Sequence, residues 1–150
     1  MKADEYKNII QMAVENEIEA YDFYTAVGEK VKDSNLQSVF KALADEEKKH
    51  RNFLQGLLSQ AKPMSFDETK DFKISETVDK PKLSMSMKPA DAIALAMKNE
   101  EEAMNMYADL AKCSVDKEQK EMFDSLARME QGHKVKLEGM YTNIAFPEVW

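Results

Sequence analysis

The chain has 150 residues, of which 43% are hydrophobic and 33% are charged, so it is long enough for one domain with a substantial core. It has only four glycines and four prolines, which favours helices over a turn-rich β fold. The net charge of −7 argues against a nucleic-acid partner, and the single cysteine, Cys113, excludes a disulfide framework and a four-cysteine metal site. The longest apolar run, residues 92–97, is too short to span a bilayer, and no apolar segment follows the charged N-terminus, so we expect a cytoplasmic protein without a membrane partner.

Four segments carry apolar residues at spacings of three and four, which predicts four amphipathic helices. In chain order the stripes run from Ile10 to Val31, from Leu36 to Leu57, from Ile93 to Leu110 and from Phe123 to Met140. Only a few residues link the first helix to the second, and the third to the fourth, so each pair is expected to be antiparallel neighbours. The candidate N-terminal caps are Asp4, Ser34 in a capping box with Gln37, Ser86, and either Ser114 or Asp116.

The connection between the two helix pairs, about residues 61–87, is different in character. Its periodicity fades, and lysine, aspartate, serine, threonine and proline collect there. So long a segment in a compact domain needs a structural reason, and two remain open: a crossover along the length of the bundle, or a mobile loop.

A duplicated motif is the most informative feature of the sequence. Glu17, Ala20 and Tyr24 recur 83 residues later as Glu100, Ala103 and Tyr107. Likewise, the second segment recurs in the fourth, with Phe40, Leu43, Ala44, Glu47 and His50 matched by Phe123, Leu126, Ala127, Glu130 and His133. The prediction is a single domain over residues 1–150 with an internal duplication, about 4–60 and 88–142.

Six polar residues of this repeat lie on the predicted apolar stripes: Glu17, Glu47, His50, Glu100, Glu130 and His133. Buried carboxylates are unfavourable unless they are paired or bound to cations, and no Lys or Arg lies on the same stripes. Glu-x-x-His places both side chains on one helix face, and two divalent cations would balance four carboxylates. An oxygen-rich set with one imidazole per ion suits iron or manganese. One motif alone would fit a solvated glutamate run or a packed core histidine equally well, but the duplication favours metal binding.

Tyr24 and Tyr107 follow the single glutamates by two helical turns. Their hydroxyls could hydrogen-bond a carboxylate of the other half and orient it, so we predict both as catalytic residues, with plain aromatic packing as the alternative. Asp45 could orient a ligand histidine in the same way, although Arg128 stands at its repeat position.

At these motifs the chain resembles the rubrerythrin-like branch of the ferritin-like superfamily. The resemblance covers about residues 4–60 and 88–142. It implies an all-α, ferritin-like antiparallel four-helix bundle with a long crossover between helices two and three. It also implies a di-iron centre, with Glu17 and Glu100 as terminal ligands, Glu47 and Glu130 as bridges, and His50 and His133 each holding one ion. Manganese and zinc are alternative metals.

Two departures from rubrerythrins bear on function. The four-cysteine rubredoxin site is missing, so the electron donor is expected to be a separate protein. Ala103 replaces an extra carboxylate that takes part in redox-linked iron movement in rubrerythrins. We expect an oxidoreductase acting on hydrogen peroxide or dioxygen, with a homodimer as the expected assembly. The alternatives are an iron binding or storage protein and a non-catalytic metal-stabilised bundle.

Overall fold

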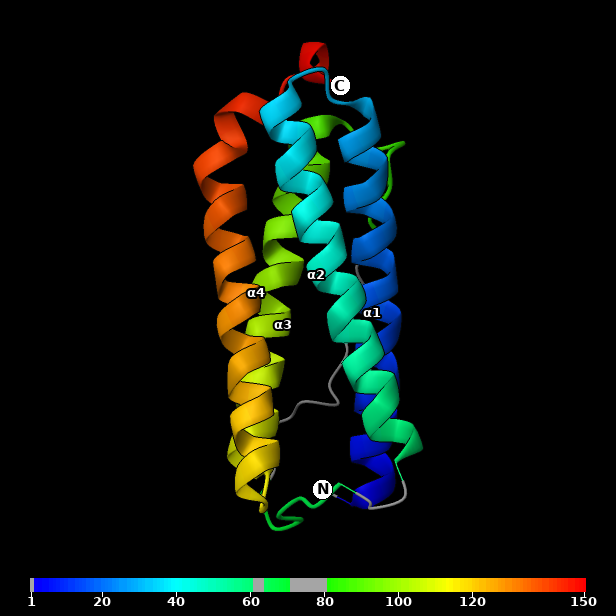
Figure 1. The fold of residues 1–150 in the computed structure, drawn as a ribbon, viewed down its shortest axis with the longest axis vertical. Helices are drawn as coiled ribbons and strands as arrows, with labels where there is room; N and C mark the ends of the chain where they lie inside the picture. The colour runs from blue at the N-terminus through cyan, green and yellow to red at the C-terminus, as the bar shows by residue number, and fades with distance from the viewer. Residues whose placement is uncertain (1, 61–63, 71–80) are drawn as a thin grey trace.

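Four long helices make up most of the computed structural model, which describes residues 2–60, 64–70 and 81–150. They are α1 (Ala3–Lys30), α2 (Ser34–Ser59), α3 (Pro89–Cys113) and α4 (Lys117–Ile144), followed by the short 3-10 helix η1 (Pro147–Val149) (Figure 1). The only β feature among the described residues is an isolated bridge between Phe66 and Ser114. The predicted all-α class is confirmed.

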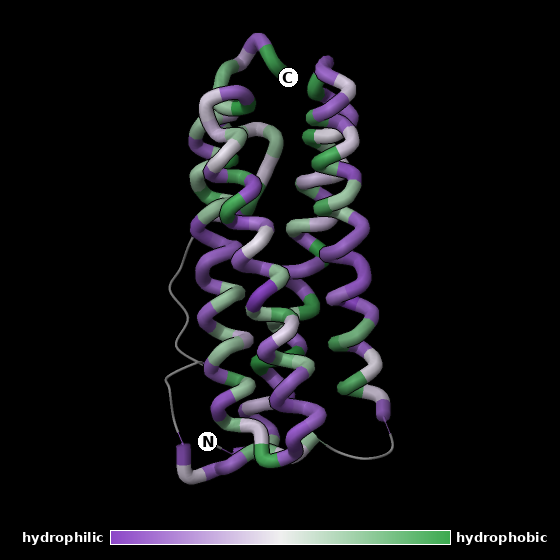
Figure 2. The backbone as a smooth tube through the Cα atoms, turned by 60° about the vertical axis from the view of Figure 1, so that its left-hand side comes forward, coloured by the Kyte–Doolittle hydropathy of each residue, from purple (hydrophilic) through white to green (hydrophobic). Residues whose placement is uncertain are grey.

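Helices α1 and α2 form one antiparallel hairpin, and α3 and α4 form the other (Figure 1). Hydrophobic and hydrophilic residues alternate along every helix (Figure 2), as expected for helices that each bury one face. The two hairpins pack into the predicted ferritin-like four-helix bundle. None of the helices in the described part of the chain has the length and hydropathy needed to cross a membrane.

The helix caps correct several predictions. Asp33, not Ser34, caps α2, because its carboxylate accepts from the backbone N–H groups of Asn35 and Leu36 at 2.8 and 3.0 Å. Helices α1 and α3 have Lys2 and Lys88 at the cap position, and neither has a side-chain cap, so the predictions of Asp4 and Ser86 were wrong.

The cap of α4 was predicted as one of two residues. Asp116 is the one that caps it, because its side chain accepts from the backbone N–H of Gln119. Asp4 lies instead in the first turn of α1, where its charge still interacts favourably with the helix N-terminus.

The described parts of the connection between the hairpins lie at opposite ends of the bundle. Residues 64–70 lie at the end where α2 and α3 finish, and residues 81–88 lead into α3 at the opposite end (Figure 1). At the first end Val115 N–H donates to the Ser65 carbonyl, and the Phe66 ring stacks on Tyr6 with centroids 3.9 Å apart. The crossover is therefore confirmed at both of its ends. The rest of the predicted connection, residues 61–63 and 71–80, lies outside the described residues.

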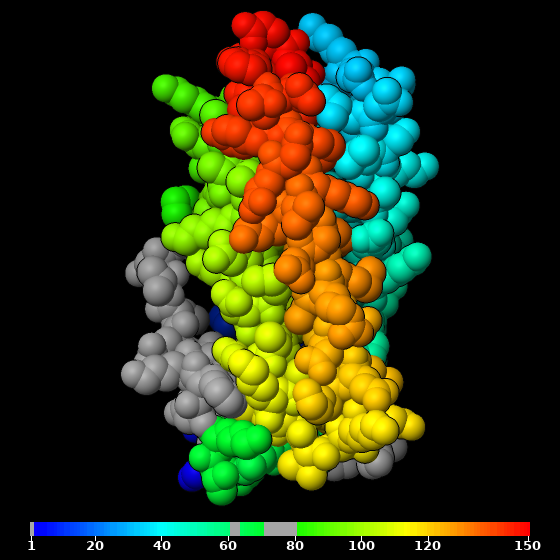
Figure 3. Space-filling view, turned by 90° about the vertical axis from the view of Figure 1, so that its left-hand side faces the viewer, coloured from blue at the N-terminus to red at the C-terminus, as the bar shows by residue number. Residues whose placement is uncertain are grey.

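The C-terminal residues dock on the end of their own bundle. Trp150 packs against Phe23, with ring centroids 6.3 Å apart, and its indole N–H donates to the Ile144 carbonyl. Lys32, in the turn between α1 and α2, donates its backbone N–H to the Val149 carbonyl. Figure 3 shows this tail (red) against the α1–α2 turn (light blue).

Candidate metal centre

A buried polar layer divides the interior of the bundle into two apolar clusters. One cluster gathers the N-terminal part of α1 and the C-terminal part of α3 with Leu54 and Phe123; the other gathers the C-terminal part of α1 and the N-terminal parts of α2 and α3 with Leu137. All six predicted ligands lie between them and are 1–3% exposed: Glu17, Glu47, His50, Glu100, Glu130 and His133. The structure thus brings together, in the interior, every residue that the repeat pattern selected.

The His50 half of the layer draws on three helices. The Nδ1 atom of His50 lies 2.6 Å from Glu130 Oε1, 3.7 Å from Glu17 Oε1 and 3.9 Å from Glu47 Oε1. These four residues form a group whose candidate ligand atoms all lie within 4.8 Å of one another. The arrangement is compact enough for one cation.

The His133 half repeats this geometry. The Nδ1 atom of His133 lies 2.6 Å from Glu47 Oε1, 3.6 Å from Glu100 Oε2 and 3.9 Å from Glu130 Oε2. Each distance agrees with its repeat-related counterpart to within 0.1 Å. Glu47 and Glu130 belong to both groups, so the two groups share a pair of carboxylates and fit a binuclear metal site.

Tyr24 and Tyr107 join the two hairpins through this layer. Tyr24 on α1 donates its hydroxyl to Glu100 on α3, and Tyr107 on α3 donates to Glu17 on α1, each at 2.6 Å. Burial and the charge of the accepting glutamate raise the pKa of each tyrosine well above 10. Both hydroxyls therefore keep their protons and act as donors, in the positions that the sequence predicted.

The environment of the two shared carboxylates, Glu47 and Glu130, disfavours their ionised form. Burial raises the pKa of Glu47 and of Glu130 well above 4.5, and the charges of neighbouring carboxylates raise both further. At Glu17, hydrogen bonds from Glu47 and His50 outweigh the effect of burial and lower the pKa. At His133, burial favours the neutral ring, but the hydrogen bonds and charges of Glu100 and Glu46 together outweigh burial and raise the pKa.

The residues present fit a pair of metal ions. Glu17 Oε2 and Glu100 Oε2 are buried and accept no hydrogen bond among the described residues, and Glu47 Oε1 and His133 Nδ1, also buried, have no polar partner at hydrogen-bond distance there except each other, 2.6 Å apart. Unpaired buried carboxylate oxygens are strongly unfavourable, and a divalent cation would satisfy them. The donor set of four carboxylates and two imidazoles has the hardness and charge that iron or manganese prefers.

Two further residues contact the outer faces of the histidine rings. Glu46 on α2 accepts from Nε2 of His133 on α4, whereas the Met129 thioether on α4 lies 3.4 Å from Nε2 of His50 on α2. Partial burial opposes ionisation of Glu46, but the hydrogen bond and charge of His133 outweigh it and lower its pKa. The prediction that Asp45 orients a histidine was wrong, because Asp45 is exposed and its neighbour Glu46 makes the contact.

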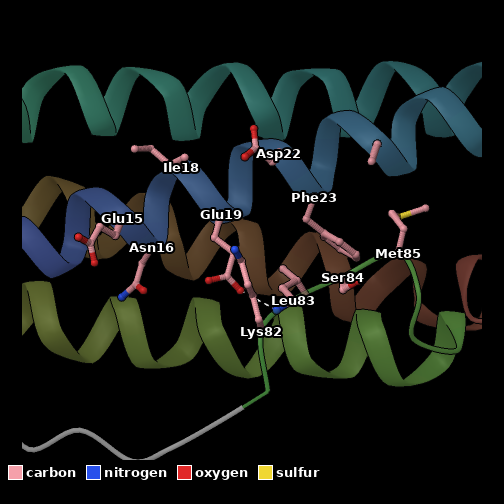
Figure 4. A pocket seen from close by; sticks show the side chains of 11 residues that line it. Glu15, Asn16, Ile18, Glu19, Asp22, Phe23, Lys82, Leu83, Ser84 and Met85 are labelled. Atoms are coloured by element: carbon pink, nitrogen blue, oxygen red, sulfur yellow. Dashed lines mark hydrogen bonds between the residues drawn. The ribbon is translucent and has the colours of Figure 1, made fainter.

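A surface pocket of about 540 Å³ lies apart from the polar layer, between α1 and residues 82–85 of the crossover. In Figure 4, Glu19 points from α1 towards Lys82 and Leu83 of the crossover, and the Leu83 N–H donates to Glu19 at 2.6 Å. The six predicted ligands do not line this pocket, so it is separate from the candidate metal centre.

Several known proteins resemble this chain in sequence or fold. The family model described as Rubrerythrin matches residues 8–141. A hypothetical protein from Pyrococcus furiosus is 30% identical, with 91% of this chain and 87% of that chain covered and a TM-score of 0.68. An uncharacterized conserved protein from Magnetospirillum magnetotacticum shares the fold at 21% identity, covering 93% and 95% of the two chains with a TM-score of 0.61. No curated protein matches the sequence.

Proposed function

The chain belongs to the rubrerythrin family, and from this premise we propose that it is a non-haem di-iron oxidoreductase that reduces hydrogen peroxide or dioxygen. Electrons would come from a donor outside these 150 residues, because their single cysteine cannot build a four-cysteine iron site. Two ferrous ions, when bound, supply the two electrons that convert one peroxide and two protons into two waters.

One observation supports this proposal above the others: two Glu/His groups share Glu47 and Glu130 in the interior of the bundle. Shared carboxylates hold two ions close enough to act on one small oxidant. His50 and His133 would each hold one ion through Nδ1, and Glu17 and Glu100 would complete the set. Tyr24 and Tyr107 keep these terminal carboxylates in place by donating hydrogen bonds to them.

The proposal is tested by loading the protein anaerobically with two equivalents of Fe(II) and mixing it with hydrogen peroxide in a stopped-flow spectrometer. Protein-bound iron should oxidise faster than free Fe(II) at the same concentration. The matched control is Glu47→Ala/Glu130→Ala, which removes both shared carboxylates and should lose two-iron occupancy. A wild-type rate no faster than free Fe(II) would rule out the oxidoreductase.

A second candidate function is iron binding without turnover. The observation that favours it is Ala103 on α3, a partly buried residue that packs against an apolar cluster and offers no further carboxylate to the centre. Repeated cycles of peroxide and chemical reductant distinguish the two functions. An oxidoreductase consumes peroxide in every cycle, whereas a binding protein oxidises its iron once or releases it.

A further inference from the structure

The two halves of the candidate centre have nearly the same distances between their predicted ligands. They differ in the residue that contacts Nε2 of each histidine, on the side of the ring away from the carboxylates. Glu46 and Met129 are repeat-related, 83 residues apart, and each reaches across the α2–α4 interface to the opposite histidine. His133 therefore has a carboxylate behind its ring, and His50 has a thioether.

The chemistry of these two contacts differs. A neutral histidine that binds a metal through Nδ1 carries its proton on Nε2, so it needs an acceptor there. The Glu46 carboxylate is a strong, charged acceptor that fixes the tautomer and ring orientation and makes Nδ1 a better donor to a cation. The Met129 sulfur is a weak acceptor and brings no charge. The side chain of Glu46 is 33% exposed and Met129 is 37% exposed, so both contacts lie at the edge of the bundle and not in its core.

We propose that Glu46 makes the two metal positions unequal, so that the position held by His133 binds a divalent cation before the position held by His50. This inference rests on the binuclear centre of the proposed function and adds an order of loading to it. Removing an acceptor behind a ligand histidine weakens metal binding by about 10- to 100-fold, which sets the expected difference between the two positions. Glu46 is thus a positioning residue, acting on the metal through His133.

The chain is well suited to a direct test, because His50 and His133 are its only histidines. Zinc, which is diamagnetic and redox-inactive, is titrated into the metal-free protein while the 15N resonances of both rings are followed by NMR. We expect the His133 resonances to reach their bound positions within the first equivalent and those of His50 within the second. Simultaneous loading, or loading of His50 first, would overturn the inference while leaving the proposed function intact. Failure to bind zinc at all would contradict both.

Three variants separate the role of the contact from a general effect on charge or folding. Glu46→Met copies the His50 half into the His133 half and should make the rings load together. Met129→Glu gives His50 its own carboxylate and should also equalise them, this time by strengthening the weaker position about 10-fold or more. Glu138→Gln, which removes one negative charge at an exposed α4 residue that pairs with Lys134, should leave the order unchanged. A wild-type order of loading in both Glu46→Met and Met129→Glu would refute the role of Glu46.

Discussion

Single tyrosine hydroxyl groups hold two buried carboxylates of the candidate metal centre, Glu17 and Glu100. Tyr24→Phe and Tyr107→Phe each remove one 2.6 Å hydrogen bond to a buried glutamate while preserving the ring. Each variant should bind metal about 10-fold more weakly, because the freed carboxylate loses its fixed orientation. Competition against a chromophoric zinc chelator measures the affinity. Tyr21→Phe, a change on α1 at a partly buried tyrosine outside the polar layer, is the control, and equal affinities in all four proteins would contradict the account.

The contact between Glu46 and His133 could not be predicted from the sequence. Asp45 and Glu46 are adjacent on α2, and neither has a carboxylate at its repeat position, where Arg128 and Met129 stand. The duplication that selected the six ligands therefore could not choose between them. One residue on a helix turns the side chain by about 100°, and only the crossing of α2 with α4 determines that Glu46, not Asp45, faces His133.

At the start of helix α2, two neighbouring residues can be compared as caps, Asp33 and Ser34. Asp33 accepts from two backbone N–H groups, whereas Ser34 is the first residue of the helix. Asp33→Ala should lower the free energy of unfolding by about 1 kcal/mol, the usual contribution of a capping side chain. Ser34→Ala should change it by less than about 0.5 kcal/mol, as for most exposed substitutions. Urea denaturation of the metal-free proteins measures both, and a larger loss at Ser34 would contradict the assignment of the cap.

The C-terminal segment offers a second comparison between neighbouring residues. Trp150 packs on Phe23 and donates to the Ile144 carbonyl, whereas Phe146 is 57% exposed. Trp150→Ala should lower the melting temperature by several degrees, because about 1–3 kcal/mol of packing and hydrogen bonding is lost. Phe146→Ala should leave the melting temperature nearly unchanged. Equal melting temperatures for Trp150→Ala and wild type would show that the tail does not stabilise the bundle.

The helices themselves were predictable because apolar residues recur along them with helical spacing. The residues that cap their N-terminal ends were less predictable. Polar side chains suited to capping occur near the start of every helix, and the local backbone determines which of them reaches the free N–H groups. The crossover could not be derived from loop length alone, since its residues carry no periodic pattern. The resemblance to a known family, and not the spacing of residues, favoured the correct path.

The two shared carboxylates, Glu47 and Glu130, make the stability of the whole bundle dependent on pH. The pKa values of Glu47 and Glu130 are raised in the folded state, so the metal-free bundle holds these protons more tightly than the unfolded chain does. Their contribution to stability is fully present below pH 4.5 and is lost as the pH rises through the raised values. A bound cation replaces the protons and should reverse this loss.

The double variant Glu47→Gln/Glu130→Gln isolates this effect. It cannot ionise at either position, so its metal-free form should be more stable than the wild type at alkaline pH and similar to it near pH 4.5. It should also gain no stability from zinc. Urea denaturation from about pH 4.5 to alkaline pH, with and without zinc, measures the effect of pH and the effect of zinc on the free energy of unfolding. A variant that keeps the wild-type pH dependence would show that these two glutamates are not its cause.

In the proposed centre, two metal ions share Glu47 and Glu130 inside the bundle. Anomalous diffraction at the iron edge, from crystals loaded anaerobically with Fe(II), would locate these ions. We expect two peaks per chain, roughly 3.5–4 Å apart, both within coordination distance of Glu47 and Glu130, with one beside His50 and the other beside His133. A single peak, or peaks that lie outside this layer, would contradict it.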